Sequence, residues 1–309
     1  MIAEHTGNPD HWQVALGSAA VEPIVVEVWR GEVVEARHRV HAVAVSDGHV
    51  VDSCGDPELS TLFRSSAKPF QALPVIRARP DLGDPEVAIA CASHLHRPDQ
   101  LEPVRSLLAK AGATEDDLEC GAEPTRLEHN CSGKHAAMLL LCRERGWLFE
   151  GYRLESHACQ ELMRAEIAAA ADLEPSSLTA AVDGCGVPTY ALTLERMALA
   201  FSQLEQLDGG PRAAQAMRAR PELIRGDGAP DTELMRLGEG WVAKGGAEGL
   251  LCAGRSGLGV ALKAEDGAWR PLRSALAAFL ARLGFEAGDL ANVPVENSRG
   301  AVVGELRAR

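Results

Sequence analysis

The stretch LFRSSAKPFQ, residues 62–71, places a serine three residues before a lysine and a proline directly after that lysine. Residues three apart are neighbours on a helix surface, so the side chains of Ser65 and Lys68 project to one side. Pro69 is tolerated in the first helical turn, where its missing N–H costs no hydrogen bond. The stretch therefore predicts a helix with Ser65 at its N-terminus, where unpaired N–H groups can stabilise an alkoxide or an oxyanion.

A lysine at this position can activate the serine. A desolvated, neutral Lys68 would accept the hydroxyl proton of Ser65, so that lysine takes the role that histidine has in other serine hydrolases. A Ser-x-x-Lys pair also arises by chance in a chain of this length. The catalytic reading therefore depends on the rest of the sequence.

The composition is that of an ordinary globular chain. With 309 residues and 46% hydrophobic content, it can bury one large core or two smaller ones. The net charge of -13 and the lack of a run rich in lysine and arginine argue against nucleic acid as a partner. The amino-terminal segment MIAEHTGNPDHWQ has no basic or apolar region, and no apolar stretch is long enough to span a membrane. We expect a soluble cytoplasmic protein without membrane contact.

The strand and helix patterns predict an α+β fold. Residues 24–54 alternate and are rich in valine, with a tight turn at Asp47-Gly48, which predicts an antiparallel meander. Helical periodicity dominates the middle of the chain, and strand patterns return only near residue 240, followed by an amphipathic helix around RPLRSALAAFLARLG. We predict one domain with two lobes and a cleft between them. Its sheet lobe covers residues 20–64 and 238–309, and its helical lobe covers residues 65–237.

Two further segments carry candidate catalytic groups. In AIACASHLH, residues 88–96, a buried run ends in a polar cluster that contains Ser93, although capping of the next helix explains this serine equally well. In WVAKGGAEG, residues 241–249, a strand carries Lys244 and two glycines allow a ligand to approach closely. The alternative for Lys244 is an exposed lysine on an edge strand.

A third constellation suits a metal. In HNCSGKHAAML, residues 129–139, Ser132 is a plausible N-cap, which places Cys131 at the mouth of a helix and Lys134 and His135 on its first turn. Cys185 lies in the glycine-rich turn VDGCGVP. The two cysteines, if they meet in space, would suit zinc, with His135 an ordinary ligand type and Lys134 an unusual one. Spacing alone leaves buried thiols as the alternative.

Five motifs in order, RSSAKP, CASH, NCSGKHAAML, DGCGVP and AKGGAEG, resemble those of the asparaginase II family, the Rhizobium-type L-asparaginases. The resemblance runs from about residue 24 to the end. It implies a fold like that of serine β-lactamases, penicillin-binding proteins and glutaminases, and it suggests a homodimer. It also implies two catalytic pairs, a zinc site and residues that line that site: Ser65 with Lys68, Ser93 with Lys244; Cys131, Lys134 and Cys185; and Arg64, His135 and Asp183.

The activity that the resemblance implies is hydrolysis of L-asparagine to L-aspartate and ammonia. Ser65 would attack the side-chain amide carbon, ammonia would leave after protonation through Ser93 and Lys244, and water would hydrolyse the acyl-enzyme. Zinc would position the substrate or the cleft rather than generate hydroxide. Arg64 or Asp183 would hold the α-carboxylate or the α-amino group.

Several alternatives stay open. Ser93 is the alternative nucleophile. A glutaminase or broader ω-amidase is the nearest competing activity, because one methylene changes pocket binding by only about 1 to 3 kcal/mol. A metal-dependent amidohydrolase and an inactive amino-acid-binding protein of the same fold are two more. Gly245 stands where β-lactamases usually carry serine or threonine, so β-lactam turnover is not expected.

Overall fold

The first strands form the predicted meander. A computed structural model describes residues 22–238 and 240–309; the amino-terminal segment and the start of the predicted sheet lobe, residues 20–21, lie outside them. Strands β1 (Ile24–Arg30), β2 (Val33–Ser46) and β3 (His49–Cys54) pair antiparallel in chain order. Asp47 and Gly48 both have positive φ, as expected for a two-residue hairpin turn.

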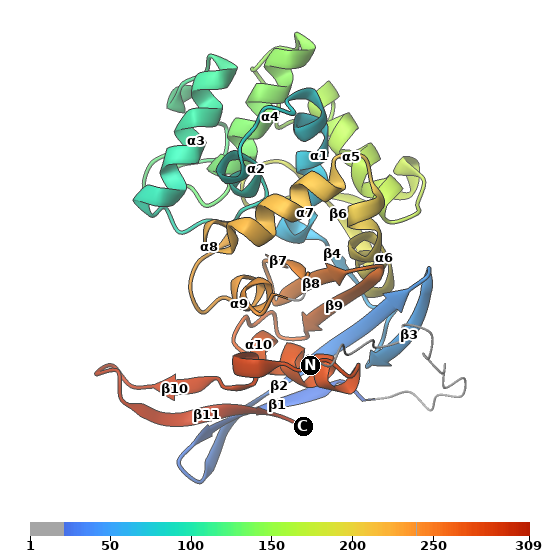
Figure 1. Cartoon of the computed structure of the whole chain (residues 1–309), viewed down its shortest axis with the longest axis vertical. Coiled ribbons are helices and arrows are strands. Elements are labelled where there is room, and N and C mark those ends of the chain that lie inside the picture. Colours follow the sequence, from blue (N-terminus) through green and yellow to red (C-terminus); the bar gives the residue numbers. More distant parts are fainter. Residues whose placement is uncertain (1–21, 239) are drawn as a thin grey trace, which may run out of the picture.

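The two distant groups of strands share one sheet, as predicted. The second group is β7 (Val242–Gly246), β8 (Leu250–Arg255) and β9 (Leu258–Ala264). Because β9 pairs with β2, the eight-stranded sheet has the order β10-β11-β1-β2-β9-β8-β7, with β3 also paired to β2. Strand β7 therefore lies at the end of the sheet that is nearest to the helices (Figure 1).

Some strands were not predicted. Between residues 65 and 240 the chain forms β5 (Ala180–Val182) and β6 (Pro188–Thr193), which make a three-stranded sheet with β4 (Ser60–Leu62), so the prediction of strands only near residue 240 is wrong. Strand β5 is short. Strand β6 runs directly into helix α6 (Leu194–Gln203), and the helical periodicity of α6 dominates the sequence pattern there. Strands β10 (Pro294–Glu296) and β11 (Val302–Ala308) were also missed, because each buries a single side chain.

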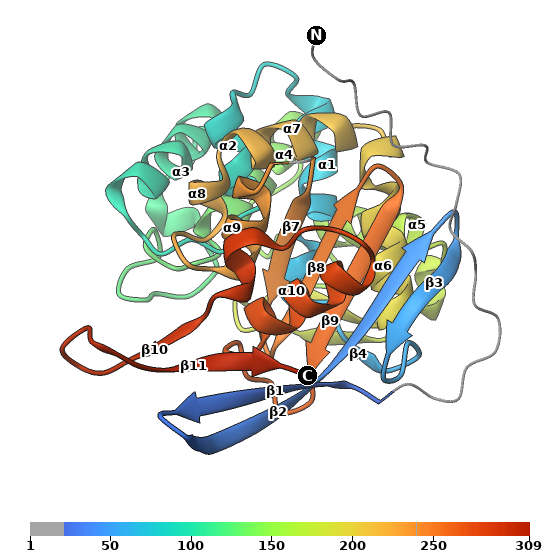
Figure 2. The ribbon, with the colours of Figure 1, turned by 60° about the horizontal axis from the view of Figure 1, so that its bottom comes forward.

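Helices cover both faces of the main sheet. Helix α10 (Leu272–Arg282), which was predicted, crosses one face, and α6 packs on β2, β8 and β9 from the other (Figure 2). The α+β prediction, an antiparallel sheet flanked by helices with a mainly helical insertion, is confirmed. The remaining helices gather on the α6 side: α1 (Lys68–Ala78), α2 (Asp84–Ala90), α3 (Pro98–Ala111), α4 (Ser132–Arg145), α5 (Ala158–Ala170), α7 (Gly210–Ala219), α8 (Pro221–Ile224) and α9 (Pro230–Arg236).

Three phenylalanines fasten the serine–lysine stretch to the core. Phe63 and Phe70 flank this stretch, with ring centroids 5.8 Å apart, and both meet Phe201 of α6 edge to face. All three are buried, and each such ring pair stabilises the fold by about 0.5 to 1.5 kcal/mol beyond area burial. These rings thus anchor the serine–lysine stretch to α6, which packs against the main sheet. Within the described residues, none of the helices has the length and apolar character of a membrane span.

Candidate active site

Ser65 lies in a short 3₁₀ helix, Arg64–Ala67, that leads into α1. Helix α1 begins at Lys68, with Pro69 in its first turn. The sequence predicted a helix that starts at Ser65, and the structure has a tighter 3₁₀ turn there, directly before α1. Arg64 has φ 48°, a left-handed conformation that costs a non-glycine residue about 1 to 3 kcal/mol. Its backbone N–H donates to Thr189 Oγ1 on β6 at 3.0 Å. A strand that the sequence did not reveal therefore holds the strained residue next to Ser65.

Lys68 is buried and reaches across to Ser93. Its Nζ donates to the carbonyl oxygen of Ala92 at 2.5 Å and to Ser93 Oγ at 3.0 Å. Within the described residues the Ser65 hydroxyl has no hydrogen-bond partner, although Ser65 and Lys68 are only one short turn apart. The structure thus joins the lysine of the first predicted pair to the serine of the second. Helix α3 begins after Arg97, so Ser93 does not cap it.

The backbone around Ser93 is clamped on two sides. Ser93 N–H donates to the carbonyl oxygen of Ile224 at 2.8 Å, and His94 Nε2 lies 2.9 Å from Ser132 Oγ. Gly133 allows this contact, because a Cβ atom there would lie 2.2 Å from the carbonyl oxygen of Ile89. The first turn of α4 can therefore touch the end of α2, which brings the cysteine motif close to the serine motifs.

Lys244 is fully buried on β7, so the alternative of an exposed edge lysine is wrong. Its Nζ donates to the carbonyl oxygen of Gly245 at 2.6 Å and lies 3.9 Å from Asp231 Oδ2. Within the described residues no hydrogen bond joins Lys244 to Ser93, so the second predicted pair is not formed directly. Ser66 Oγ instead donates to the carbonyl oxygen of Lys244 at 2.8 Å and ties β7 to the serine turn.

Asp231 was missed by sequence reasoning. It is fully buried on α9 and accepts hydrogen bonds from Gly245 N–H at 2.9 Å and from Thr232 N–H at 3.0 Å. Burial lowers the pKa of Lys244 to about 7, although the Asp231 carboxylate acts to raise it. In sequence, an acidic residue after Pro230 in a first helical turn indicates only a favourable helix start. The contact with Lys244 is decided by tertiary structure.

The three predicted zinc ligands lie together. Lys134 Nζ donates to Cys185 Sγ at 3.0 Å, and the thiols of Cys131 and Cys185 interact. This interaction and the charges of Lys68 and Lys134 hold the pKa of Cys131 well below its usual value, despite burial. The predicted helix cap is wrong by one residue: Cys131 is the N-cap of α4, and Ser132 Oγ donates to the carbonyl oxygen of Leu127.

The three residues that the resemblance places around this cluster already have side-chain partners. Arg64 Nε donates to Asp183 Oδ1 at 2.9 Å. Burial alone would raise the pKa of Asp183, but the charges of Lys134 and Arg64 lower it. His135 Nδ1 lies 2.6 Å from the Tyr152 hydroxyl, and burial lowers the pKa of His135 to about 4, which keeps the imidazole neutral.

The donor set near Cys131 suits zinc on one condition. Across residues 22–238 and 240–309, His, Cys, Asp and Glu side chains form no group of three that could hold a metal ion. A zinc site would therefore need the neutral amine of Lys134 beside the two sulfur atoms, and sulfur and nitrogen are the ligands that zinc prefers. The interaction of Lys134 Nζ with Cys185 shows that the amine already lies within reach of the sulfur cluster.

The model of the L-asparaginase II family matches residues 26–308. The chain belongs to the L-asparaginase II family. This membership supports an amidohydrolase activity on a small-molecule substrate. A search of curated proteins found no match.

Several solved structures resemble this L-asparaginase II family member at low identity. Mglu in its native form is 13% identical with a TM-score of 0.47, over 81% of this chain and 66% of the Mglu chain, so the chain spans just under two thirds of it. A probable glutaminase from Bacillus subtilis complexed with 6-diazo-5-oxo-L-norleucine is 15% identical with a TM-score of 0.39, over 80% of this chain and 84% of the other. A β-lactamase from Mycobacterium bovis is 14% identical with a TM-score of 0.37, over 80% and 95%. Likenesses this distant say nothing about substrate.

Proposed function

We propose that the chain is an L-asparaginase, which hydrolyses L-asparagine to L-aspartate and ammonia through an acyl-enzyme on Ser65. The observation that carries this proposal is the buried Lys68 amine, which shares a turn with Ser65 and lies 3.0 Å from Ser93 Oγ. Burial of a lysine costs free energy unless its amine is hydrogen-bonded, and buried titratable groups of this kind cluster at functional sites. Family membership supports hydrolysis of an amide.

Lys68 is suited to accept the proton of Ser65. In its neutral form the Lys68 amine has two hydrogens and one lone pair. Its hydrogen bonds to Ala92 O and Ser93 Oγ use both hydrogens. The lone pair is then left for the Ser65 hydroxyl. As Ser65 Oγ attacks the side-chain amide carbon, its proton moves to Lys68, and the carbonyl electron pair moves to the oxygen.

Ser93 is suited to protonate the leaving nitrogen. Its Oγ accepts a hydrogen bond from Lys68, so its own hydrogen is free to be donated. Collapse of the tetrahedral intermediate then breaks the carbon–nitrogen bond and releases ammonia. Ser93 would regain a proton from Lys68 or from Lys244, which would have to turn away from the Gly245 carbonyl. Water hydrolyses the ester, and its proton returns by the same groups.

Zinc enters the proposal as a bound metal rather than as the source of the nucleophile. Cys131, Lys134 and Cys185 would hold it, and it would act as a Lewis acid that orients the substrate. Zinc content of the purified protein and of Cys185→Ser, measured by elemental analysis, tests this part. The homodimer and the cytoplasmic location stay predictions from the sequence.

Ammonia release from L-asparagine and L-glutamine tests the activity. We expect turnover of L-asparagine by the wild type, a loss of at least about 1,000-fold in kcat for Ser65→Ala and Lys68→Met, and wild-type rates for the exposed control Ser176→Ala. A covalent adduct trapped on Ser65 and found by mass spectrometry would support the nucleophile. Full activity of Ser65→Ala would move the nucleophile to Ser93, preferred turnover of glutamine would make the enzyme a glutaminase, and binding without turnover would contradict the proposal.

A further inference from the structure

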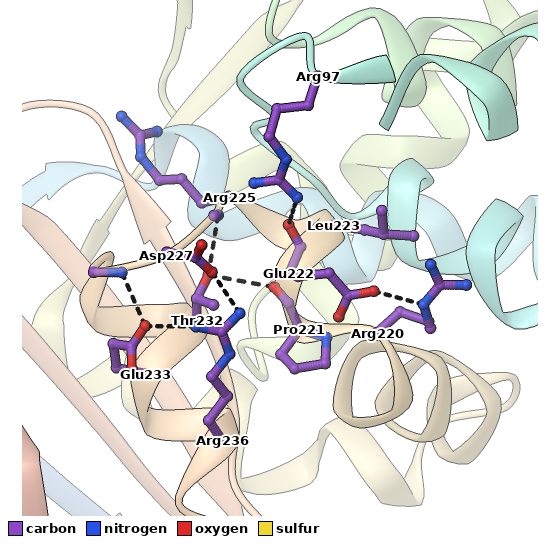
Figure 3. Close-up of polar contacts among 12 residues, drawn as sticks. Arg97, Arg220, Pro221, Glu222, Leu223, Arg225, Asp227, Thr232, Glu233 and Arg236 are labelled. Atoms are coloured by element: carbon purple, nitrogen blue, oxygen red, sulfur yellow. Dashed lines mark hydrogen bonds and ion pairs between the residues drawn. The ribbon is translucent and has the colours of Figure 1, made fainter. Parts of the chain in front are cut away.

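Arg225 differs from the neighbouring arginines. Residues 220–236 are fastened by a network in which Arg97, Arg220 and Arg236 each pair with a carboxylate of Asp99, Glu222, Asp227 or Glu233. The Arg225 side chain points away from this network (Figure 3). In the part of the chain that the structure describes, its guanidinium has no hydrogen bond and no carboxylate partner. It lies over the ring of Trp269, 4.5 Å from the ring centroid.

The backbone of Arg225 is fixed beside Ser93. Gln100 Nε2 donates to the carbonyl oxygen of Arg225 at 3.0 Å, and the preceding carbonyl, that of Ile224, accepts the N–H of Ser93 at 2.8 Å. Gln100 is fully buried. Two hydrogen bonds therefore fix the backbone of Arg225 relative to the backbone of Ser93.

The Trp269 ring connects Arg225 to the other side of the site. A Cβ atom at Gly245 would lie 2.1 Å from Cη2 of Trp269, so the ring packs directly on the residue after Lys244. Glycine at position 245 is required for this contact. The positive charge of Arg225 contributes, after burial and the charge of Lys68, to the lowered pKa of Lys244. Arg225 thus lies between the Ser93 segment and the Lys244 strand.

Stacking prepares a guanidinium to bind a carboxylate. The guanidinium of Arg225 lies over the indole and has no hydrogen bond among the described residues, so its N–H groups are available for a bidentate contact. Arg64 is less suitable, because its Nε already donates to Asp183, whereas the Arg225 guanidinium has no carboxylate partner among the described residues.

We propose that Arg225, stacked on Trp269 beside Ser93 and Lys244, binds the α-carboxylate of the substrate and so makes the enzyme select amides of amino acids. The inference rests on the proposed function and assigns a specificity residue to it. It places the substrate carboxylate at Arg225 rather than at Arg64.

The test compares two amides that differ only in the α-carboxylate. L-Asparagine has this group, and 3-aminopropanamide lacks it. We expect Arg225→Gln to lower kcat/KM for L-asparagine by about 10- to 100-fold, mostly through KM, because a hydrogen bond to a charged group contributes about 1.5 to 3 kcal/mol. The rate with 3-aminopropanamide should change by less than about 3-fold. Arg270→Gln, which removes an exposed charge next to Trp269, is the matched control.

The outcomes separate the two proposals. An equal loss on both amides, with unchanged thermal unfolding, would overturn the role of Arg225 and leave the asparaginase intact. If the wild type turns over neither L-asparagine nor L-glutamine, the proposed function fails. In that case, or if it does not accept 3-aminopropanamide, calorimetric binding of L-aspartate decides: weaker binding by Arg225→Gln than by Arg270→Gln supports a carboxylate site, and equal binding overturns it.

Discussion

At the residue scale, Lys244 shows how opposing effects set the charge of a buried group. Burial is the largest effect and lowers its pKa, Asp231 raises it, and Lys68 and Arg225 lower it, while Cys131 acts weakly in the raising direction. The result is a pKa of about 7. A lysine with that pKa can both give and accept a proton at neutral pH, which the ordinary value of 10.5 would not permit.

Asp231→Asn should change the pH dependence of the reaction. Because protonated Lys244 would return a proton to Ser93, kcat/KM should fall as the pH increases through the pKa of Lys244. Removal of the Asp231 charge lowers this pKa further, so the falling limb should move to lower pH by about 1 unit or more. A pH profile of kcat/KM between pH 5 and 9 measures the shift. Asp227→Asn, an exposed carboxylate of the same loop, is the control, and an unmoved limb in Asp231→Asn would contradict the role of Lys244.

At the element scale, the position of Ser93 depends on the way α2 packs against α3. Glu86 of α2 accepts hydrogen bonds from Gly83 N–H at 2.9 Å, Ser106 Oγ at 2.5 Å and Lys110 Nζ at 2.8 Å. It therefore caps its own helix and ties it to α3. Burial alone would raise the pKa of Glu86, but the hydrogen bonds from Lys110, Ser106 and Gly83 lower it.

Glu86→Gln should destabilise the protein in a pH-dependent manner. A carboxyl group whose folded pKa lies below its unfolded value stabilises the fold above the unfolded pKa, and this contribution disappears as the pH falls through the folded pKa. We expect the free energy of unfolding to drop by about 1 to 3 kcal/mol at pH 7 and by less as the pH falls below 4.5. Urea denaturation at pH 7 and pH 4 measures both. Glu102→Gln on the exposed side of α3 should have little effect at either pH, and a pH-independent loss in Glu86→Gln would contradict the ionic contribution.

At the scale of the whole molecule, the sheet depends on contacts between residues far apart in the chain. Strand β1 pairs with β11 from Val26 opposite Ala308 to Arg30 opposite Gly304, and β2 pairs with β9. The helical region is inserted between these strand groups (Figures 1 and 2). The charge of Lys68 therefore acts on Lys244 only when both halves of the sheet have assembled.

Removal of residues 302–309 should weaken the whole sheet. It deletes β11, loses the buried Leu306 and leaves β1 with an unpaired edge. We expect a loss of at least about 2 kcal/mol in the free energy of unfolding, the contribution of one buried leucine, and an increased tendency to aggregate. Chemical denaturation and size-exclusion chromatography measure these effects. Val302→Ser, at an exposed position of the same strand, is the control, and an unchanged unfolding midpoint after the deletion would show that β11 does not support the sheet.

The elements with strong local patterns could be predicted, and those without them could not. The valine-rich meander, the three glycine-bounded strands and the amphipathic α10 have a periodicity that can be read directly. Strands β5, β6, β10 and β11 are short or half-exposed, and their pairing is set by partners that lie elsewhere in the chain. The same distinction holds in the site. Motifs indicated Ser65, Lys68, Ser93, Lys244 and the cysteine cluster as candidates, whereas Asp231 and Arg225 stand in segments that look like ordinary helix starts and loops.

The sequence by itself determined the α+β class and the family and supplied the candidate residues of the site, because these depend on residue types in a fixed order. Only the tertiary structure decided which groups meet. It joined Lys68 to Ser93, put Asp231 beneath Lys244 and stacked Arg225 on Trp269. These contacts link residues that are 25, 13 and 44 positions apart in the chain. The physical reason is that side-chain hydrogen bonds and charge interactions act over a few ångströms in space and leave no periodic pattern in the sequence.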